Sequence, residues 1–384
     1  MAQALALALA AFERGDCAPN PAVGAVLVNA SGEVIGQGQT QAPGGAHAEI
    51  MALRDAAARG HNPQGATIYV TLEPCAHQGR TGPCCDALIA AGVRRVVASL
   101  QDPNPLVAGQ GFAKLRAAGI EVEVGAQAAQ AHEIQLGFMT RMQTGRPWVR
   151  CKIGASLDGR TALLNGVSQW ITSPAARADG QFWRARAQAI LTGIGTVLAD
   201  DPLLTVRTER PQPPQPTAAQ PALVVLDHQL RTPVQARLLR AHSEPSQPRP
   251  IWLFASDDGE PGRQARAQAL QAQGAEWVKT DPSDLGAVLH ELGRREINEL
   301  HVEAGATLTG ALLAGAWVDE VLLYVAPVFL GPGRPLAELP ALTQLVPTVD
   351  ANAHTPASSK WGWQFVEATP IGPDLRLRLR RRAL

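Results

Sequence analysis

The feature that most constrains this fold is a regular alternation of strand-like and helix-like segments across residues 1–125. Apolar and β-branched runs recur between stretches of helical periodicity that end at glycines. A first helix is expected to end at Gly15, and 22–38 predicts two strands around a turn at Ser31 and Gly32. Strands that alternate with helices of about ten residues predict an α/β fold with parallel strands and a sheet covered by helices. Further helices are expected within 47–60, 84–92 and 111–119, and further strands within 66–72, 93–100 and 120–125.

A second domain is expected after a helix at 126–146. A glycine–arginine–proline sequence at 145–147 breaks that helix, so we predict domains at 1–144 and 147–384. The second half again alternates strands and helices, and the alternating arginines at 375–380 predict a last strand with an arginine face. Strands are expected within 148–159, 189–194, 222–227, 251–256, 299–305 and 320–331, helices within 174–188 and 307–317, and loops at 211–221 and 242–250.

Charge and composition exclude several classes of protein. Lys and Arg number 34, as do Asp and Glu, so no net charge draws the chain toward nucleic-acid phosphates or anionic lipid. The N-terminal apolar run lacks a basic leader, and no stretch reaches the roughly eighteen apolar residues of a membrane span. We therefore expect a soluble, cytoplasmic protein that binds neither nucleic acid nor membrane. The 5 cysteines are odd in number and lack a secretory signal, which favours a metal site over disulfides.

Four residues form the strongest chemical motif: His47, Glu49, Cys75 and Cys84. A catalytic zinc takes three protein ligands and leaves one position to water, and one histidine with two thiolates meets that count. Glu49 is too close in sequence to His47 to be a comfortable fourth ligand. It is well placed to take a proton from the attacking water and pass it to a leaving amine. A His-x-Glu followed by Pro-Cys is typical of zinc nucleobase deaminases.

The second half of that signature, P-C-x-x-C, is absent, because eight residues lie between Cys75 and Cys84. Alternatives therefore remain: cysteines in a core without metal, a purely structural zinc, or Cys85 as ligand in place of Cys84. His77 is a further possible ligand, although lining the pocket is its more ordinary role. A nucleic-acid-editing deaminase is the alternative function. It would need the short spacing, a basic groove and stacking aromatics, and aromatic residues make up only 4% of this chain.

Longer stretches of the sequence resemble a known family. APNPAVGAVLV, HAEIMAL, TLEPCAHQGRTGPCCDALIAAG and DPNPLVAGQG resemble the deaminase half of the bifunctional deaminase/reductase of bacterial riboflavin biosynthesis. KIGASLDGRTA, SQWITSPAAR, AILTGIGTVLADDPLLTVR and HVEAGATLTGALL are similar to its reductase half. The resemblance covers nearly the whole chain. It implies a cytidine-deaminase-like αβα domain followed by a dihydrofolate-reductase-like α/β domain, and a homo-oligomer formed through the reductase domain.

Two consecutive reactions follow from the resemblance. Zinc-dependent hydrolysis removes the 2-amino group of 2,5-diamino-6-ribosylamino-4(3H)-pyrimidinone 5′-phosphate. NADPH then reduces the ribosyl chain, which gives 5-amino-6-ribitylaminouracil 5′-phosphate. The resemblance assigns zinc to His47, Cys75 and Cys84, proton transfer to Glu49, and a position near the substrate ring to Asn20.

Two positions depart from the family pattern. The cysteine loop usually has the sequence T-P-P-C, and here T-G-P-C at 81–84 introduces Gly82, which loosens the loop but keeps the ligand spacing. Before His47 the family often carries a histidine in a G-x-H segment, where this chain has G-Q-T at 38–40. The zinc chemistry depends on neither position.

The reductase half lacks a Rossmann fingerprint. After the expected strand at 299–305, Thr307 is predicted to cap a helix whose free N–H groups face an anion. From the residues alone, an ordinary capped turn is the alternative; the resemblance favours a dinucleotide phosphate site. Lys152 is the first candidate and Asp200 the second to supply the proton that accompanies hydride transfer. The resemblance places the cofactor contacts at Gly154, Trp170, Thr196, Asp200, Gly305, Ala306, Thr307, Leu308, Thr309 and Gly310. It places the substrate contacts at Ser168, Arg184, Leu204, Arg207 and Glu303.

Overall fold

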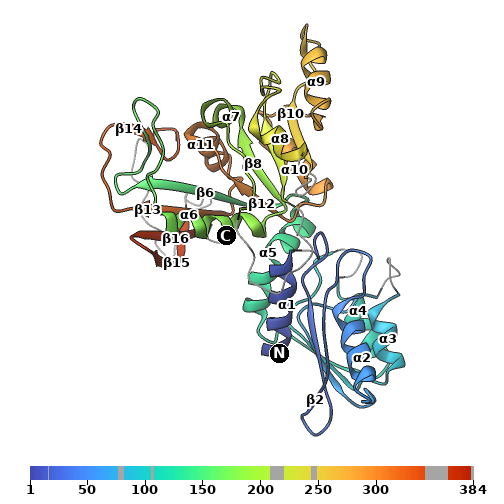
Figure 1. Ribbon diagram of the computed structural model, residues 1–384. Helices are drawn as coiled ribbons and strands as arrows, with labels where there is room; N and C mark the ends of the chain where they lie inside the picture. Colours follow the sequence, from blue (N-terminus) through green and yellow to red (C-terminus); the bar gives the residue numbers. More distant parts are fainter. Residues whose placement is uncertain are drawn as a thin grey trace. The chain divides into compact units, whose positions relative to one another are not determined.

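Two large sheets, one in each half of the chain, organise the fold in this computed structural model (Figure 1). The contacts between residues divide the chain into two units, Met1–Arg146 and Pro147–Leu384. None of the helices in the described part of the chain has the length and hydrophobicity that a bilayer-spanning helix needs. The predicted loops at 211–221 and 242–250 lie mostly outside the described residues, and His77 lies outside them altogether. The structure describes residues 1–15, 17–76, 82–104, 108–207, 220–243, 249–341 and 362–381.

The N-terminal unit contains a mixed sheet in the order β2-β1-β3-β4-β5. Strands β3 (Thr67–Val70), β4 (Arg95–Ala98) and β5 (Glu121–Val124) run parallel, as predicted. Strand β1 (Gly24–Val28) runs antiparallel to β2 (Val34–Gln39), which confirms the predicted pair of strands around a turn, since only antiparallel strands can be joined without a long crossover. Strand β1 also runs antiparallel to β3, so the prediction of parallel strands is wrong for this pair.

Helices cover both faces of this sheet (Figure 1). On one face α1 (Ala2–Arg14) contacts α5 (Ala128–Thr144). On the other, α3 (Cys84–Ala90) contacts both α2 (Ala48–Ala58) and α4 (Gln110–Ala117). The result is the three-layer αβα arrangement that the alternation of elements predicts.

Two glycines allow α2 to approach the sheet closely. A Cβ atom on Gly36 would lie 2.3 Å from the carbonyl oxygen of Ala52, and one on Gly38 would lie 2.4 Å from that of Ala48. No side chain fits at such distances, so glycine is required at both positions of β2. The close contact holds the first turn of α2, and therefore His47 and Glu49, firmly against the sheet.

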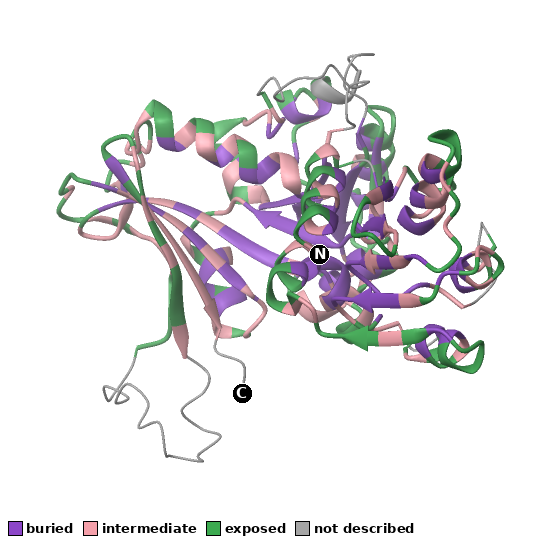
Figure 2. Ribbon diagram, turned by 90° about the horizontal axis from the view of Figure 1, so that it is seen from below, coloured by how far each residue is buried: buried purple, intermediate pink, exposed green. Residues whose placement is uncertain are grey.

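The C-terminal unit is built on a nine-stranded sheet in the order β11-β10-β9-β8-β12-β6-β13-β16-β15. The strands from β11 to β13 run parallel, and the last three pair antiparallel. Most of the central strands are buried (Figure 2). The strands are β6 (Trp148–Ser156), β8 (Ala189–Gly193), β9 (Ala222–Leu226), β10 (Ile251–Ala255), β11 (Ala275–Lys279), β12 (Glu299–Val302), β13 (Glu320–Ala326), β15 (Trp363–Ile371) and β16 (Asp374–Arg381).

Helices and a small ribbon complete this unit. The ribbon pairs β7 (Arg160–Leu163) antiparallel with β14 (Gly333–Pro335). Helix α8 takes in the first two residues of the loop predicted at 242–250, so that loop starts later than expected. The helices are α6 (Pro174–Arg186), α7 (Ile194–Asp200), α8 (Arg237–Ser243), α9 (Arg263–Gln271), α10 (Leu285–Arg294) and α11 (Ala306–Ala314).

The predicted arginine face of the last strand is confirmed, and it forms an ion-pair network. Arg378 and Arg380 of β16 each donate to the buried carboxylate of Glu320, at 2.9 and 2.7 Å. The fully buried Arg150 donates to the same carboxylate at 2.7 Å and to Glu299 at 2.8 Å. Burial opposes ionisation of Glu320, yet Arg150 and Arg378 hold its pKa well below the usual value. The network therefore fixes the C-terminal strand to the sheet with its charges paired.

Candidate functional site

Three metal-ligand side chains meet where α2 and α3 begin. His47 is the N-cap of α2, Cys84 is the first residue of α3, and Cys75 lies in the loop after β3. His47 Nδ1 lies 3.6 Å from Cys75 Sγ and 3.3 Å from Cys84 Sγ. Ligand atoms on a tetrahedral zinc, bound at about 2.0–2.3 Å, lie roughly 3.3–3.8 Å from one another. The three side chains therefore fit a zinc ion and leave one coordination position for another ligand.

The neighbouring Cys85 points away from this triad. Its thiol donates to the carbonyl oxygens of Pro74 at 3.2 Å and Gly111 at 3.5 Å. Burial raises the pKa of Cys85 to about 12, so it remains a protonated thiol in the core. Of the two adjacent cysteines, the structure thus brings Cys84 to the histidine, because successive positions on a helix face different directions.

Charge in the triad favours a thiolate. The hydrogen bond from Cys84 and then the His47 ring lower the pKa of Cys75 to about 4. The same hydrogen bond and burial raise the pKa of Cys84, because one thiolate discourages a second beside it. A divalent cation removes that conflict, since a coordinating thiol is deprotonated by the metal. The starts of α2 and α3 add positive helix-dipole ends on the same side.

Glu49 lies in the first turn of α2 and is buried, with only 4% of its surface exposed. Its carboxyl group forms a hydrogen bond with Cys84 and is repelled by the negative charge of the Cys75 thiolate. Burial, and then the Cys75 charge, raises the pKa of Glu49 to about 7. A carboxyl group with this pKa takes up and releases protons near neutral pH, as a group that moves a proton in both directions must.

One buried residue beside the triad was missed by the sequence analysis. The carboxylate of Glu73 accepts hydrogen bonds from four backbone N–H groups across 102–112, those of Asp102 (3.1 Å), Gly109 (2.9 Å), Gly111 (2.9 Å) and Phe112 (3.2 Å). It ties this segment to the chain just before Cys75. No sequence pattern marks such a role, because all four partners are distant in sequence.

Thr40 and Asn20 have local contacts. The Thr40 hydroxyl is buried and accepts a hydrogen bond from the backbone N–H of Val23 at 3.0 Å. Thr40 is therefore a structural residue at the position where the family often has a histidine. The backbone N–H of Asn20 donates to Cys17 at 2.9 Å, and Asn20 is half-buried. Among the described residues, no hydrogen bond joins Asn20 to the triad.

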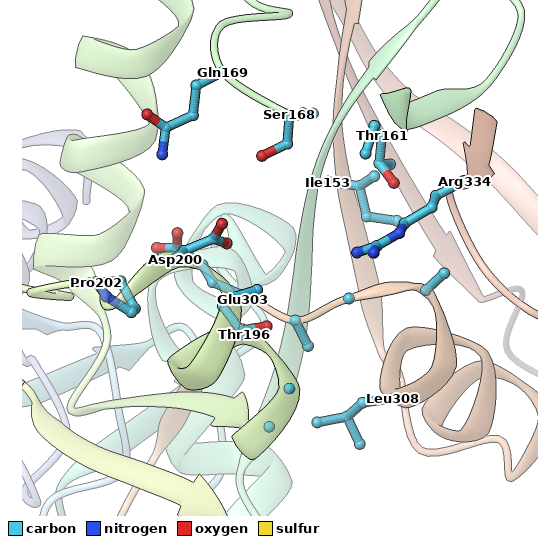
Figure 3. Close-up of a pocket in the computed structure, with 18 of the residues that line it drawn as sticks. Ile153, Thr161, Ser168, Gln169, Thr196, Asp200, Pro202, Glu303, Leu308 and Arg334 are labelled. Carbon is cyan, nitrogen blue, oxygen red and sulfur yellow. The ribbon is translucent and has the colours of Figure 1, made fainter. Parts of the chain in front are cut away.

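The C-terminal unit holds a cavity of about 1440 Å³ (Figure 3). It lies at the carboxyl ends of β8 and β12 and beside β6, the edge at which parallel sheets usually bind ligands. Figure 3 shows Ser168, Asp200 and Glu303 from separate segments around one space. Most residues predicted for the cofactor and substrate line this cavity: Lys152, Gly154, Ser168, Trp170, Arg184, Thr196, Asp200, Leu204, Arg207, Glu303, Gly305, Ala306, Thr307 and Leu308.

Two predicted cofactor residues, Thr309 and Gly310, are placed in the core behind the cavity wall. Thr309 is buried, and its hydroxyl faces Cys151 Sγ at 3.9 Å. A Cβ atom on Gly310 would lie 2.0 Å from the carbonyl oxygen of Glu338. Gly310 therefore allows the segment around Glu338 to pack against α11.

The prediction that Thr307 caps α11 is wrong. The helix begins at Ala306, with Gly305 as the N-cap and no side-chain cap. The backbone of Gly305 is extended (φ −71°, ψ 173°), so the helical conformation starts at the next residue, Ala306. Thr307 is therefore the second residue of the helix and lies in its first turn. In the described part of the chain, the backbone N–H groups of Ala306, Thr307 and Leu308 have no hydrogen-bond acceptor. Since all three residues line the cavity, their free N–H groups suit the phosphates of a dinucleotide.

A buried ion pair spans the cavity wall. Arg184 of α6 donates to both carboxylate oxygens of Glu303, at 2.7 and 2.9 Å, and to the carbonyl oxygen of Thr205 at 2.6 Å. Burial opposes ionisation of Glu303, but Arg184, then His301 and Lys152, hold its pKa well below the usual value. Glu303 therefore remains a carboxylate, held in a fixed orientation by a bidentate arginine.

Lys152 of β6 and Trp170, in the segment between β7 and α6, both line the cavity. Lys152 of β6 passes Gly180 of α6 and lies with Nζ 5.9 Å from the centre of the Tyr324 ring. Trp170 is 68% exposed, and the Arg177 guanidinium stacks on its ring at 4.3 Å. Exposed aromatic surface at a cavity mouth is suited to contact a planar ligand.

Comparisons with known proteins cover both units. The family model described as "Cytidine and deoxycytidylate deaminase zinc-binding region" matches residues 1–100, and "RibD C-terminal domain" matches residues 147–375. The "Riboflavin biosynthesis protein RibD" of Escherichia coli is 46% identical over 98% of this chain and 97% of its own. That of Haemophilus influenzae is 42% identical over 97% of this chain and 94% of its own.

Solved structures agree with these matches. Acinetobacter baumannii RibD has a TM-score of 0.83 at 38% identity, covering 100% of this chain and 98% of that one. A Thermotoga maritima protein, described as a diaminohydroxyphosphoribosylaminopyrimidine deaminase/5-amino-6-(5-phosphoribosylamino)uracil reductase, has a TM-score of 0.82 at 29% identity. The match covers 100% of this chain and 97% of that protein.

Proposed function

The chain belongs to the bifunctional RibD family of riboflavin biosynthesis, and on that premise we propose which residues carry each of its two activities. It is a deaminase and a reductase, with zinc and NADPH as cofactors. The diaminopyrimidine ribosyl phosphate is first deaminated, and its ribosyl chain is then reduced to ribityl. This membership replaces the alternative of a nucleic-acid-editing deaminase. We assign deamination to a domain at 1–144 and reduction to a domain at 147–384.

In the deaminase, His47, Cys75 and Cys84 are the proposed zinc ligands. Zinc, when bound, supplies the positive charge that makes water a nucleophile at neutral pH. Glu49 accepts a proton of the attacking water and delivers it to the 2-amino nitrogen, which leaves as ammonia, while the second proton of the water goes to the ring nitrogen as the carbonyl group forms. Its burial beside Cys84 keeps bulk water from competing for that proton. Asn20 is proposed to lie near the substrate ring.

In the reductase, the free N–H groups at the start of α11 are proposed to bind the cofactor phosphates. NADPH, when bound, supplies the hydride. Lys152 is proposed to donate the proton needed at the ring-opened imine or the sugar oxygen, with Asp200 as the second candidate. Arg184 holds Glu303 in place, and the pair is proposed to contact the substrate together with Ser168, Leu204 and Arg207. The other proposed cofactor contacts are Gly154, Trp170, Thr196 and Asp200, with Thr309 and Gly310 supporting the α11 turn.

We also propose that the protein is cytoplasmic and that it assembles as a homo-oligomer through its reductase unit. Strand β15 ends the large sheet, and among the described strands it pairs only with β16. Phe365 on this strand is 68% exposed and Val366 is 41% exposed. An apolar, unpaired edge strand favours association, which light scattering on the purified chain would measure.

The observation that carries the proposed assignment is the convergence of one histidine and two cysteines beside a buried glutamate, in a unit separate from the large cavity. The test is incubation of the full chain with the diaminopyrimidine ribosyl phosphate, followed by mass analysis. The deaminated product should form without NADPH, and the ribityl product should form only with it. Reduction of the substrate while its 2-amino group is intact would contradict the proposed order.

A further inference from the structure

Of the three proposed zinc ligands, Cys75 alone lies in a loop. His47 is the N-cap of α2 and Cys84 is the first residue of α3, so the packing of these helices fixes both. Cys75 comes after the end of β3 and belongs to neither a helix nor a strand. A ligand atom on a loop is placed accurately only if the backbone on both sides of it is held. The contacts of that backbone therefore determine how well the three ligand atoms are placed.

The start of α3 holds Cys75 itself. The backbone N–H of Cys85 donates to the carbonyl oxygen of Cys75 at 3.1 Å, and that of Cys84 donates to Cys75 Sγ at 3.3 Å. The first N–H groups of a helix have no acceptor within the helix, so they are free to make these contacts. They fix the carbonyl group and the sulfur atom of Cys75 and leave the chain on its amino side to other groups.

Pro74, on the amino side, is held between α3 and α4. Its carbonyl oxygen accepts a hydrogen bond from the Cys85 thiol at 3.2 Å. A Cβ atom on Gly111 would lie 2.0 Å from the same oxygen, so only glycine fits there and its backbone packs directly against Pro74. The position of Pro74 therefore depends on where α4 begins.

Glu73 fixes the start of α4. Its Oε1 atom accepts from the N–H groups of Gly111 and Phe112, in the first turn of the helix. Its Oε2 atom accepts from those of Gly109 at 2.9 Å and Asp102 at 3.1 Å. Gly109 is the N-cap of α4 and has no side chain, so the distant carboxylate takes the place of a capping residue. One buried side chain thus attaches the start of α4 to the chain two residues before the zinc ligand.

We propose that Glu73 is a positioning residue for the zinc ion. By capping α4 it holds Pro74 in place, and Pro74 in turn keeps Cys75 Sγ within reach of a metal bound to His47 and Cys84. Glu73 acts through the backbone and is not a ligand, because a carboxylate has about four lone-pair sites and four N–H groups occupy them. This inference rests on the proposed zinc ligands.

Zinc affinity tests the proposal, measured on the full chain by competition with a chromophoric chelator. Glu73→Gln turns an NH₂ group toward two N–H donors, so the start of α4 should move and Cys75 with it. The Kd for zinc should rise by about 10- to 100-fold, the range for loss of a partner that orients metal ligands. In the cobalt-substituted protein, the thiolate-to-cobalt absorption band should weaken or shift. Glu73→Asp keeps the charge on a shorter side chain, so it should raise the Kd less.

Two control variants separate ligand placement from general stability. Asp227 is a buried carboxylate of the other unit that accepts from the N–H groups of Arg231 at 2.9 Å and Thr232 at 2.7 Å. Leu115 is a buried core residue of α4 itself. Asp227→Asn and Leu115→Ala should both lower the melting temperature. Their zinc Kd should stay within about twofold of the wild type, as for sites that do not interact.

The proposal is overturned if Glu73→Gln binds zinc as tightly as the wild type and keeps its cobalt spectrum. It is also overturned if Leu115→Ala raises the Kd as much as Glu73→Gln does. If circular dichroism shows that Glu73→Gln does not fold, Glu73→Asp replaces it in the same comparison with Leu115→Ala.

The outcome for the proposed zinc ligands is distinguishable from that for Glu73. A wild type that binds no zinc, or a Cys84→Ser variant that keeps it, would contradict the ligand set and this inference with it. Zinc binding that is lost in Cys84→Ser but unchanged in both Glu73 variants would leave the ligand set intact and overturn the role of Glu73 alone.

Discussion

The zinc triad and the reductase cavity differ in how many residues they use and how strictly those residues are placed. The triad needs three ligand atoms within 4.8 Å of one another, supplied by the starts of two helices and one loop. The cavity encloses about 1440 Å³ and is lined by many residues from well-separated segments. A metal site depends wholly on each ligand, whereas a large binding site divides its affinity among many contacts. Single substitutions should therefore abolish the first activity and only weaken the second.

Cys84→Ser should have the largest effect. The triad would keep one histidine and one thiolate, so zinc should fall from about one per chain to nearly none, and deamination should be lost with it. Cys85→Ser is the matched control, because Cys85 faces the carbonyl oxygens of Pro74 and Gly111 instead of the triad. Elemental analysis and a deaminase assay measure both effects. If the Cys85 variant loses zinc while the Cys84 variant retains it, the ligand assignment must be reversed.

Glu49→Gln should come next, with zinc content near that of wild type. The amide can neither accept the proton of water nor deliver it to the departing amine, so deamination should fall by about 10⁴-fold, the upper end for general acid–base catalysis. The reductase should still convert deaminated substrate with NADPH, because its cavity lies in the other unit. Near-normal deamination would exclude Glu49 as the proton carrier.

Glu303→Gln should weaken the reductase and leave the deaminase intact. Arg184 would lose its charged, bidentate partner in a buried position, which costs roughly 3 kcal/mol of unfolding free energy in the C-terminal unit. We expect reductase kcat/KM to fall by about 10- to 100-fold, as for the loss of one charged contact. Glu338→Gln is the control, because Glu338 lines the same cavity and forms no ion pair with the residues that the structure describes. An equal loss of reductase kcat/KM in both variants would show that the Arg184–Glu303 ion pair has no specific role in the reaction.

Acid should destabilise the C-terminal unit through its arginine network. Burial opposes ionisation of Glu367, but hydrogen bonds from Arg376, Thr369 and Arg378 lower its pKa from 4.5 to about 2, and the pKa of Glu320 is also lowered. Carboxylates with lowered pKa values stabilise the fold fully above pH 4.5, and this contribution is lost as the pH falls toward 2. Urea unfolding at pH 7, 4 and 3 should show the decline. Glu367→Gln should make the free energy of unfolding fall less steeply with decreasing pH. An unchanged dependence on pH would show that Glu367 does not contribute to the loss of stability.

Gly82→Ala should have the smallest effect of all. A Cβ atom at Gly82 would have no atom of the described residues within 4 Å, so alanine fits against them without displacing Cys84. Lower entropy of the unfolded chain should stabilise the protein by about 0.4–1 kcal/mol. Zinc content and deamination should match the wild type, as measured by elemental analysis and thermal unfolding. Loss of zinc would show that the loop needs glycine for the ligand geometry.

The sequence predicted much of the fold because short-range patterns report short-range structure. The periodicities of 2 and 3.6 residues placed the helices and strands of the N-terminal unit and most central strands of the C-terminal sheet, but they missed helices α7 to α10 and strands β7, β11, β14 and β15. The family resemblance to a cytidine-deaminase-like and a dihydrofolate-reductase-like domain is confirmed by the comparisons. The antiparallel β1 was missed at the level of the sheet, since pairing partners are not encoded in a local pattern. The start of α11 was misplaced because threonine is a common N-cap residue, whereas here Gly305, two residues before Thr307, is the N-cap and the helix begins at Ala306.

By itself, then, the sequence determined the order of elements in the N-terminal unit, the chemistry of a zinc deaminase in His47, Glu49, Cys75 and Cys84, and the family of the chain. Only the tertiary structure decided which long-range partners meet. Glu73 binds N–H groups up to 39 residues away, and Arg184 pairs with a glutamate 119 residues away. Such contacts are set by how sheets and helices pack, and a side chain carries no local mark of a partner that folding alone brings near it.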